Sequence, residues 1–108
     1  MKPGDYLSKE DAGKIIRQCS QQNRIVLTKH FRDELQNENL TIADVYRVIQ
    51  RGYVFDHPER NVATGDWKYR LSGTGPDGQF VTIVFCISSD EEGILITIFS
   101  VDDGSGRR

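Results

Sequence analysis

The chain has 108 residues, a length that suits one domain with a single modest core. Hydrophobic residues make up 37% and charged residues 28%, as in an ordinary soluble globular protein. The formal net charge is −2 and the sequence pI about 5.6, which excludes a basic surface spread over the whole molecule. Any contact with nucleic acid therefore has to come from a local patch.

We expect a single domain over residues 1–103 and a flexible tail at 104–108. The N-terminus lacks the hydrophobic core of a signal peptide, and no apolar run approaches the roughly 18 residues of a membrane span. These observations predict a cytoplasmic protein with no membrane partner. Cys19 falls on the apolar side of a predicted helix and Cys86 inside a predicted strand, so both are expected to be buried free thiols.

The first part of the chain predicts two helices separated by a short strand. Ser8 is a typical N-cap, and apolar residues recur at helical spacing over about residues 9–22. Residues 24–27 form a short run with β-branched side chains, which predicts a strand. Thr28 ends this strand and caps a second predicted helix over 29–37.

A third helix is predicted for residues 42–51, where a capping-box variant precedes an apolar stripe. Gly52 follows at the position where a left-handed helix cap is expected. A short strand is predicted over 53–55. Residues 56–60 are expected to form a loop, because Pro58 cannot donate a backbone hydrogen bond.

The remainder of the chain predicts three strands, at 67–73, 79–88 and 93–101, the first two joined by a turn at 75–78. The second and third strands are apolar on both faces, as central strands usually are. Helices first and a meander of strands afterwards indicate an α+β fold, with the helices packed on one side of an antiparallel sheet.

The predicted strand at 67–73 alternates large and cationic side chains with the period of two that a half-buried strand shows. Trp67 and Tyr69 share one face, and Lys68 and Arg70 share the other. Two cations about 7 Å apart suit the phosphate oxygens of RNA, but a solvated strand face with cross-strand ion pairs shows the same pattern. A register flip would instead expose Trp67 and Tyr69 as a stacking platform for bases.

Several short segments are informative in combination. They are Thr28-Lys29-His30-Phe31-Arg32-Asp33-Glu34-Leu35, Leu40-Thr41 with Asp44-Val45, Gly52, Pro58-Glu59, Gly65-Asp66-Trp67-Lys68-Tyr69-Arg70, Pro76-Asp77-Gly78 and Ile96-Thr97-Ile98-Phe99-Ser100. Over roughly residues 24–101, their order and spacing resemble a bacterial family catalogued as a domain of unknown function and grouped with the RelE-like and BrnT-like toxins of toxin–antitoxin modules. The resemblance implies a RelE-like α+β fold, with N-terminal helices packed on one face of a curved antiparallel sheet of about four to five strands.

The resemblance also implies a function for the uncovered face of the sheet. Toxins of this group cut RNA there without a metal or cofactor, by attack of a 2′-hydroxyl on the neighbouring phosphate. A cognate antitoxin protein would cover the same face. Many relatives carry arginines four and eight residues after the histidine that matches His30, whereas this chain has Glu34 and Glu38, which weakens a nucleic-acid face there.

The resemblance and the cation pair together indicate six candidate residues. These are His30, Lys68 and Arg70 for catalysis, and Arg32, Arg60 and Tyr69 for RNA binding. His30 would act as acid or base, because an imidazole exchanges a proton near neutral pH. Lys68 and Arg70 would hold and neutralise the phosphate. In the alternative interpretation, His30 is a structural residue that hydrogen-bonds at the start of its helix.

A metal site and a Cys–His hydrolase are not predicted, because the two histidines and two cysteines are scattered without ligand spacing. Two alternatives to a toxin-like endoribonuclease remain open. One is a non-catalytic module on the same fold that binds a protein or an RNA. The other is a homodimer that pairs through the apolar stretch 94–99, if this strand lies at a sheet edge.

Overall fold

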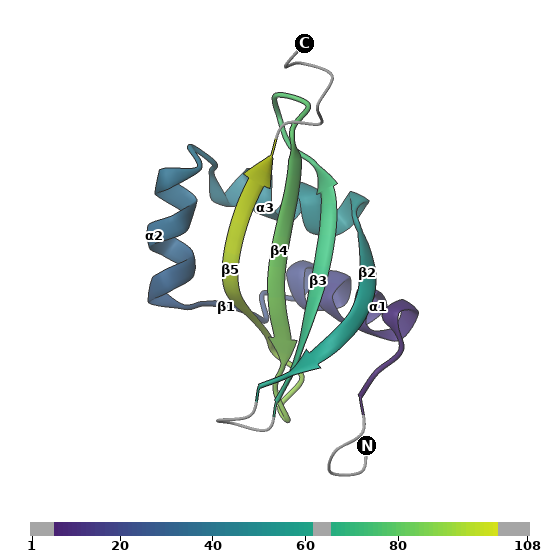
Figure 1. Ribbon diagram of the computed structural model, residues 1–108. Helices are drawn as coiled ribbons and strands as arrows, with labels where there is room; N and C mark the ends of the chain where they lie inside the picture. The colour runs from purple at the N-terminus through teal and green to yellow at the C-terminus, as the bar shows by residue number, and fades with distance from the viewer. Residues whose placement is uncertain (1–5, 62–65, 102–108) are drawn as a thin grey trace.

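The computed structural model describes residues 6–61 and 66–101, so the predicted tail at 104–108 lies outside the described residues. Within these residues, three helices and five strands form an α+β fold, as the sequence predicts. Figure 1 shows a curved sheet with α1 (Lys9–Gln21) and α3 (Ile42–Arg51) behind one face, and α2 (Lys29–Asn37) beside one edge.

The predicted caps start the first two helices. The Ser8 hydroxyl accepts a hydrogen bond from the amide three residues later, at 3.1 Å, and α1 begins at the next residue. The Thr28 hydroxyl does the same for α2, at 3.2 Å. These hydroxyls satisfy backbone donors that have no partner inside the helix, which is why both helices begin where the sequence predicts.

The third helix begins at the predicted capping box, but it does not end in a left-handed residue. Gly52 has φ −81° and ψ −175°, which is extended backbone. The reason for glycine is close packing: a Cβ there would lie 2.5 Å from the Ser72 carbonyl oxygen and 2.7 Å from that of Val48. Gly52 therefore lets α3 and the sheet approach each other.

The sheet has the strand order β1-β5-β4-β3-β2. Its strands are β1 (Ile25–Leu27), β2 (Tyr53–Arg60), β3 (Trp67–Thr74), β4 (Phe80–Ile87) and β5 (Gly93–Val101). β2 to β5 pair antiparallel, whereas β1 pairs parallel to β5. The sheet is therefore mixed, whereas the sequence predicts an antiparallel sheet. The helices and strands between β1 and β5 allow the parallel pairing, which a short hairpin cannot make.

The predicted loop at 56–60 is instead part of β2, which continues to Arg60 through a register shift between Phe55 and Glu59. Asp56 at this irregularity has φ 66°. Pro58 is tolerated because β2 is the outermost strand on its side of the sheet, where a missing backbone donor costs no ladder bond.

The hydrophobic core lies between the sheet and the helices. The strands contribute Tyr69, Leu71, Val81, Ile83, Phe85, Leu95 and Ile98, and the helices contribute Ala12, Ile16, Phe31, Leu35, Val45, Val48 and Ile49. Both cysteines are buried and free, as predicted. The sheet thus has one face inside the core and one open face, defined here as the face that carries Arg70, Val84 and Thr97.

The edge of β5 is occupied at its start and near its end. β1 pairs with its first residues, and the Thr28 amide donates to the Leu95 carbonyl at 3.2 Å. Further along, the Glu38 carboxylate of the α2 C-cap accepts a hydrogen bond from the Ser100 amide at 3.1 Å. The homodimer through this strand stays a prediction, and it would have to displace these contacts.

Candidate functional site

The side chains of β3 alternate between the two faces of the sheet as the sequence predicts, with Tyr69 on one face and Arg70 on the other. Tyr69 is only 2% exposed, and its ring stacks on Phe85 with centroids 5.6 Å apart. Its hydroxyl accepts a hydrogen bond from the Leu7 amide at 2.8 Å. Tyr69 is therefore a core residue, and its assignment as an RNA contact was wrong because stacking on a base needs an exposed ring.

Arg60 also lies away from the open face. It is opposite Trp67 in the β2–β3 ladder, and its guanidinium carbon lies 5.7 Å from the centroid of the indole ring. Trp67 packs against the core on the same side of the sheet as Tyr69. The structure thus separates Arg60 from Lys68 and Arg70, which project from the opposite face.

Arg70 does point to the open face, but two carboxylates hold it. Its guanidinium lies 2.7 Å from the Glu59 carboxylate and 3.8 Å from that of Asp56. Glu59 is also opposite Lys68 in the ladder. Asp56 and Glu59 come from the irregular part of β2, which the sequence predicts as a loop, and they compensate the positive charge that the sequence places on β3.

His30 lies at the start of α2 and contacts the open face. Its Nε2 is 3.3 Å from the Thr97 hydroxyl oxygen on β5. The register aligns Arg70, Val84 and Thr97 in one row across three strands, so the backbones of Arg70 and Thr97 are roughly 10 Å apart. His30 and Arg70 therefore stand at the two ends of one row, with Val84 between them.

Arg32 does not join this row. It follows His30 by two positions, which is about 200° around an α-helix, so it projects away from Thr97. Of the six predicted residues, the structure brings His30, Lys68 and Arg70 to one face and leaves Arg32, Arg60 and Tyr69 outside it. Glu34 lies one helical turn beyond His30, on the same side of α2.

Neither thiol is suited to nucleophilic chemistry. Burial raises the pKa of Cys19 and of Cys86 above the usual value of a thiol. Both side chains are therefore protonated at neutral pH, and the reactive thiolate is scarce. Among residues 6–61 and 66–101, no three His, Cys, Asp or Glu side chains are grouped so that they could hold a metal ion.

The sequence interpretation missed an exposed cluster at one end of the open face. This apolar patch consists of Tyr53, Phe80, Phe99 and Val101, whose residues are between 43% and 59% exposed. The register places Phe80 opposite Val101. The sequence holds no clear signal for this patch, because residues 80–85 and 94–99 are nearly continuous apolar runs, which do not reveal the face that is covered.

The patch surrounds a pair of buried hydroxyls. Ser72 and Thr82 lie opposite each other, and their side-chain oxygens are 2.8 Å apart. Tyr53 is opposite Ser72, and Phe99 is opposite Thr82. One row across the sheet therefore has an aromatic ring at each end and the two hydroxyls at its centre. Because the two hydroxyls satisfy each other, the floor of the patch can be covered by an apolar group without stranding a polar atom.

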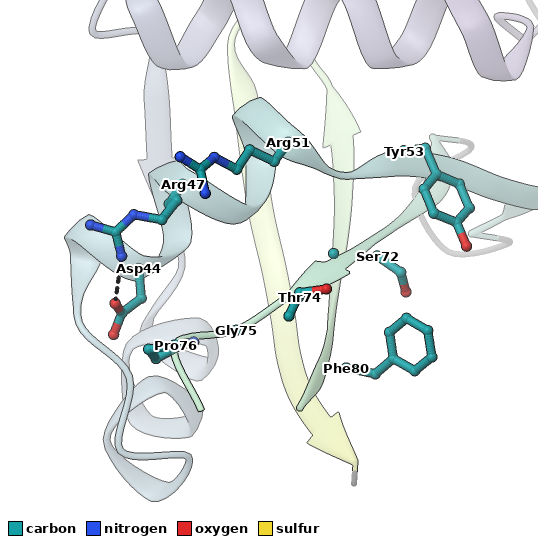
Figure 2. Close-up of a pocket in the computed structure, with 10 residues that line it drawn as sticks. Asp44, Arg47, Arg51, Tyr53, Ser72, Thr74, Gly75, Pro76 and Phe80 are labelled. Atoms are coloured by element: carbon teal, nitrogen blue, oxygen red, sulfur yellow. Dashed lines mark hydrogen bonds and ion pairs between the residues drawn. The ribbon is translucent and has the colours of Figure 1, made fainter. Parts of the chain in front are cut away.

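A cavity of about 630 Å³ opens beside the patch, between α3 and the end of the β3–β4 hairpin (Figure 2). It is lined by Asp44, Arg47, Arg51, Tyr53, Ser72, Gly73, Thr74, Gly75, Pro76 and Phe80. Tyr53 and Phe80 belong to both the patch and the cavity. The cavity therefore adds two arginines to an otherwise apolar surface.

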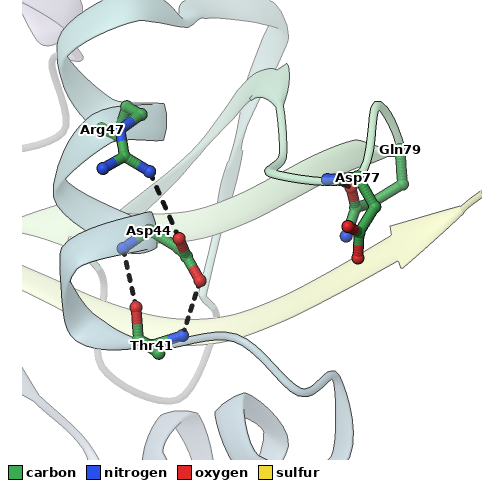
Figure 3. A network of polar contacts seen from close by, with 5 residues as sticks. All are labelled: Thr41, Asp44, Arg47, Asp77 and Gln79. Carbon is green, nitrogen blue, oxygen red and sulfur yellow. Dashed lines mark hydrogen bonds and ion pairs between the residues drawn. The ribbon is translucent and has the colours of Figure 1, made fainter.

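One of the two arginines is already paired. Arg47 lies 3.4 Å from the Asp44 carboxylate, which also accepts the Thr41 amide at 2.9 Å (Figure 3). The hydrogen bond from the Thr41 backbone and, to a lesser extent, the Arg47 charge lower the pKa of Asp44. Arg51 forms no ion pair with any residue in the described part of the chain.

The fold and this surface define an α+β protein with one helix-covered and one open sheet face. The sequence profile of the family described as Domain of unknown function (DUF4258) matches residues 27–100, and the chain belongs to this family. No curated protein and no solved structure matches the chain. No helix in the described residues is long and apolar enough to span a membrane.

Proposed function

We propose that this protein is a non-catalytic binding module whose apolar patch holds a second polypeptide. The observation that carries the proposal is the gathering of Tyr53, Phe80, Phe99 and Val101 at one end of the open face, all exposed. Contiguous exposed apolar side chains with a polar rim are typical of protein interaction sites.

The charges near the open face favour a polypeptide over RNA. Arg70 is held by Asp56 and Glu59, and α2 presents Glu34 and Glu38 along the β5 side. RNA affinity depends on unpaired cations that displace counterions from phosphates, and these carboxylates oppose that contribution. The resemblance to toxins of toxin–antitoxin modules supplies a candidate partner, a cognate antitoxin with an amphipathic segment.

Co-expression with the product of the adjacent gene tests the proposal. We expect the two proteins to form a complex that size-exclusion chromatography with light scattering detects. The double variant Phe99→Ser/Val101→Ser should weaken it at least about tenfold, because it removes two apolar contacts from the patch. The control is Ile42→Ser, which changes an equally apolar side chain, 39% exposed, on the helical side.

Two results would contradict the proposal. The first is that the wild-type proteins do not associate. The second is that the patch variant and the Ile42→Ser control bind the partner equally well while both remain folded by circular dichroism.

A second candidate function is metal-independent RNA cleavage, and the observation that favours it is the row that places His30 and Arg70 on one face. The 2′-oxygen would attack the adjacent phosphorus while the bond to the 5′-oxygen breaks. The imidazole would take up or deliver the proton, and Lys68 and Arg70 would stabilise the charge on phosphate.

Incubation of the purified protein with single-stranded RNA in EDTA tests this second function. Cleavage that is lost in His30→Ala and in Lys68→Ala, but kept in the charge-matched control Lys14→Gln on α1, would support the enzyme. If the wild-type protein leaves the RNA intact and the co-expression experiment yields a complex, the result would contradict RNA cleavage and support the binding module.

A further inference from the structure

We propose that the cavity between α3 and the β3–β4 hairpin binds an extended acidic segment of the partner polypeptide. A carboxylate of this segment contacts Arg51, and an apolar side chain further along it lies between Tyr53 and Phe80. This inference rests on the proposed binding function and specifies the chemistry of the segment that the module takes.

The size of the cavity fits a short peptide segment. Its volume of about 630 Å³ falls within the range of roughly 300–1,000 Å³ typical of ligand sites. Figure 2 shows the arginine side chains on one side of Thr74 and the rings of Tyr53 and Phe80 on the other. The cationic and aromatic ends of the cavity are thus separated by a strand backbone, and a ligand has to be elongated to contact both.

The charge of the lining matches one carboxylate. Asp44 compensates Arg47, so Arg51 contributes the one net positive charge of the cavity. A carboxylate brings one negative charge, which Arg51 can neutralise, whereas a phosphate monoester brings about 1.5 to 2 and would leave charge uncompensated. An exposed arginine with aromatic neighbours is also typical of the residues that contribute most to protein interfaces.

The backbone of β3 offers a place for an extended segment. The β2–β3 ladder ends at the pair of Tyr53 and Ser72, so Thr74 has no partner on β2. Gly75 donates to Gln79 across the hairpin at 2.8 Å, and antiparallel alternation turns the amide and carbonyl of Thr74 toward the opposite side, where the cavity lies. A peptide strand placed there would add to the sheet beyond the start of β2.

NMR titration of the ¹⁵N-labelled full chain tests the inference with three probes. The first is a tripeptide of aspartate, leucine and phenylalanine with blocked ends, the second is its asparagine counterpart, and the third is adenosine monophosphate. We expect the acidic tripeptide to shift the signals of Arg51, Tyr53, Thr74 and Phe80 in a saturable way. The asparagine tripeptide should bind about tenfold more weakly, because it cannot form a charge-assisted hydrogen bond.

Arg51→Gln should lower the affinity for the acidic tripeptide about tenfold and leave that for the asparagine tripeptide unchanged. The matched control is Arg32→Gln, which removes the same charge from an exposed helical position on α2. It should bind both tripeptides as the wild type does. Equal binding of the two tripeptides, shifts confined to other surfaces, or tighter binding of adenosine monophosphate would each overturn the inference.

The partner complex separates this inference from the proposed function. A complex that Phe99→Ser/Val101→Ser breaks but Arg51→Gln leaves intact would overturn the acidic segment and retain the binding module. Neither Phe99 nor Val101 lines the cavity, so the two variants report on different parts of the surface.

Discussion

The two faces of the sheet obey different physical demands although they share the same strands. On the covered face, Leu71, Ile83 and Ile98 are fully buried and aligned across β3, β4 and β5. One residue earlier along each strand, Arg70, Thr82 and Thr97 face the open side. The difference shows that folding constrains one face, which leaves the other free to carry charged and exposed aromatic side chains.

The ends of the open face differ as well. At one end, the His30 imidazole and the Arg70 guanidinium have partners within the protein. At the other, the rings of Tyr53 and Phe80 are exposed beside Arg51, which forms no ion pair within the described residues. Groups that already satisfy one another gain little from a new ligand, while exposed rings and a free cation gain more. We therefore locate the proposed binding function at the second end.

The sharpest test of the two faces compares phenylalanines on one strand. Phe85→Ala on the covered face should lower the free energy of unfolding by about 3–5 kcal/mol, because it leaves a cavity in the core. Phe80→Ala on the open face should lower it by less than about 1 kcal/mol, because Phe80 is already 46% exposed and its removal leaves no cavity in the core. Urea denaturation measures both, and similar losses would contradict the division between the faces.

Gly52 tests how closely the covered face must approach its helices. Gly52→Ala should lower the free energy of unfolding by about 1–3 kcal/mol, because the new Cβ would press on two backbone carbonyl oxygens that cannot rotate away. Gly13→Ala in α1 is the matched control, where the Cβ would meet only the flexible end of Arg17 at 3.3 Å. It should stabilise the protein by about 0.5–1 kcal/mol, and a loss equal to that of Gly52→Ala would refute the packing argument.

Alkaline pH should lower the free energy of unfolding, because buried groups of the core would have to ionise. Burial raises the pKa of Tyr69, so its contribution to stability is complete below about pH 10, the pKa of tyrosine in an unfolded chain, and is lost as the pH rises through the folded-state pKa. Cys19 and Cys86 act in the same direction from about pH 8.5 upward.

Urea denaturation at pH 7, 9 and 10.5 measures this loss. Tyr69→Phe should cost about 1–2 kcal/mol at pH 7, because the Leu7 amide loses its acceptor, and should flatten the decline above about pH 10. An unchanged slope in Tyr69→Phe would show that another group titrates.

The smallest effect is expected at the ion pairs of the open face. Glu59→Gln should change the free energy of unfolding by less than about 1 kcal/mol, because Arg70 and Glu59 are both substantially exposed and water screens their attraction. The difference from wild type should vanish in 1 M salt. A loss that is large and independent of salt would mean that this pair holds β2 on the sheet.

Local signals predicted most of the fold. The caps at Ser8, Thr28 and Thr41 place the helix starts, since a side-chain hydroxyl satisfies an amide only three residues away. The alternation along β3 puts Tyr69 and Arg70 on opposite faces for an equally local reason, but it does not say which face is covered. Pro58 misled because its effect depends on whether the strand lies at an edge, which is a property of the whole sheet.

The candidate site was less predictable. His30, Lys68 and Arg70 do share one face, but the carboxylates that surround Arg70 come from β2, eleven or more residues away. Tyr53, Phe80 and Phe99 are far apart in the chain and meet only through the register of four strands. No periodicity within a single segment reports such a meeting.

The amino-acid order alone determined where the helices begin and that the two faces of β3 differ, because these depend on hydrogen bonds and spacing within a few residues. Only the tertiary structure decided which cations form ion pairs and where exposed aromatic rings lie close together. Ion pairs and exposed clusters form between strands, and their partners are fixed by the pairing of distant segments.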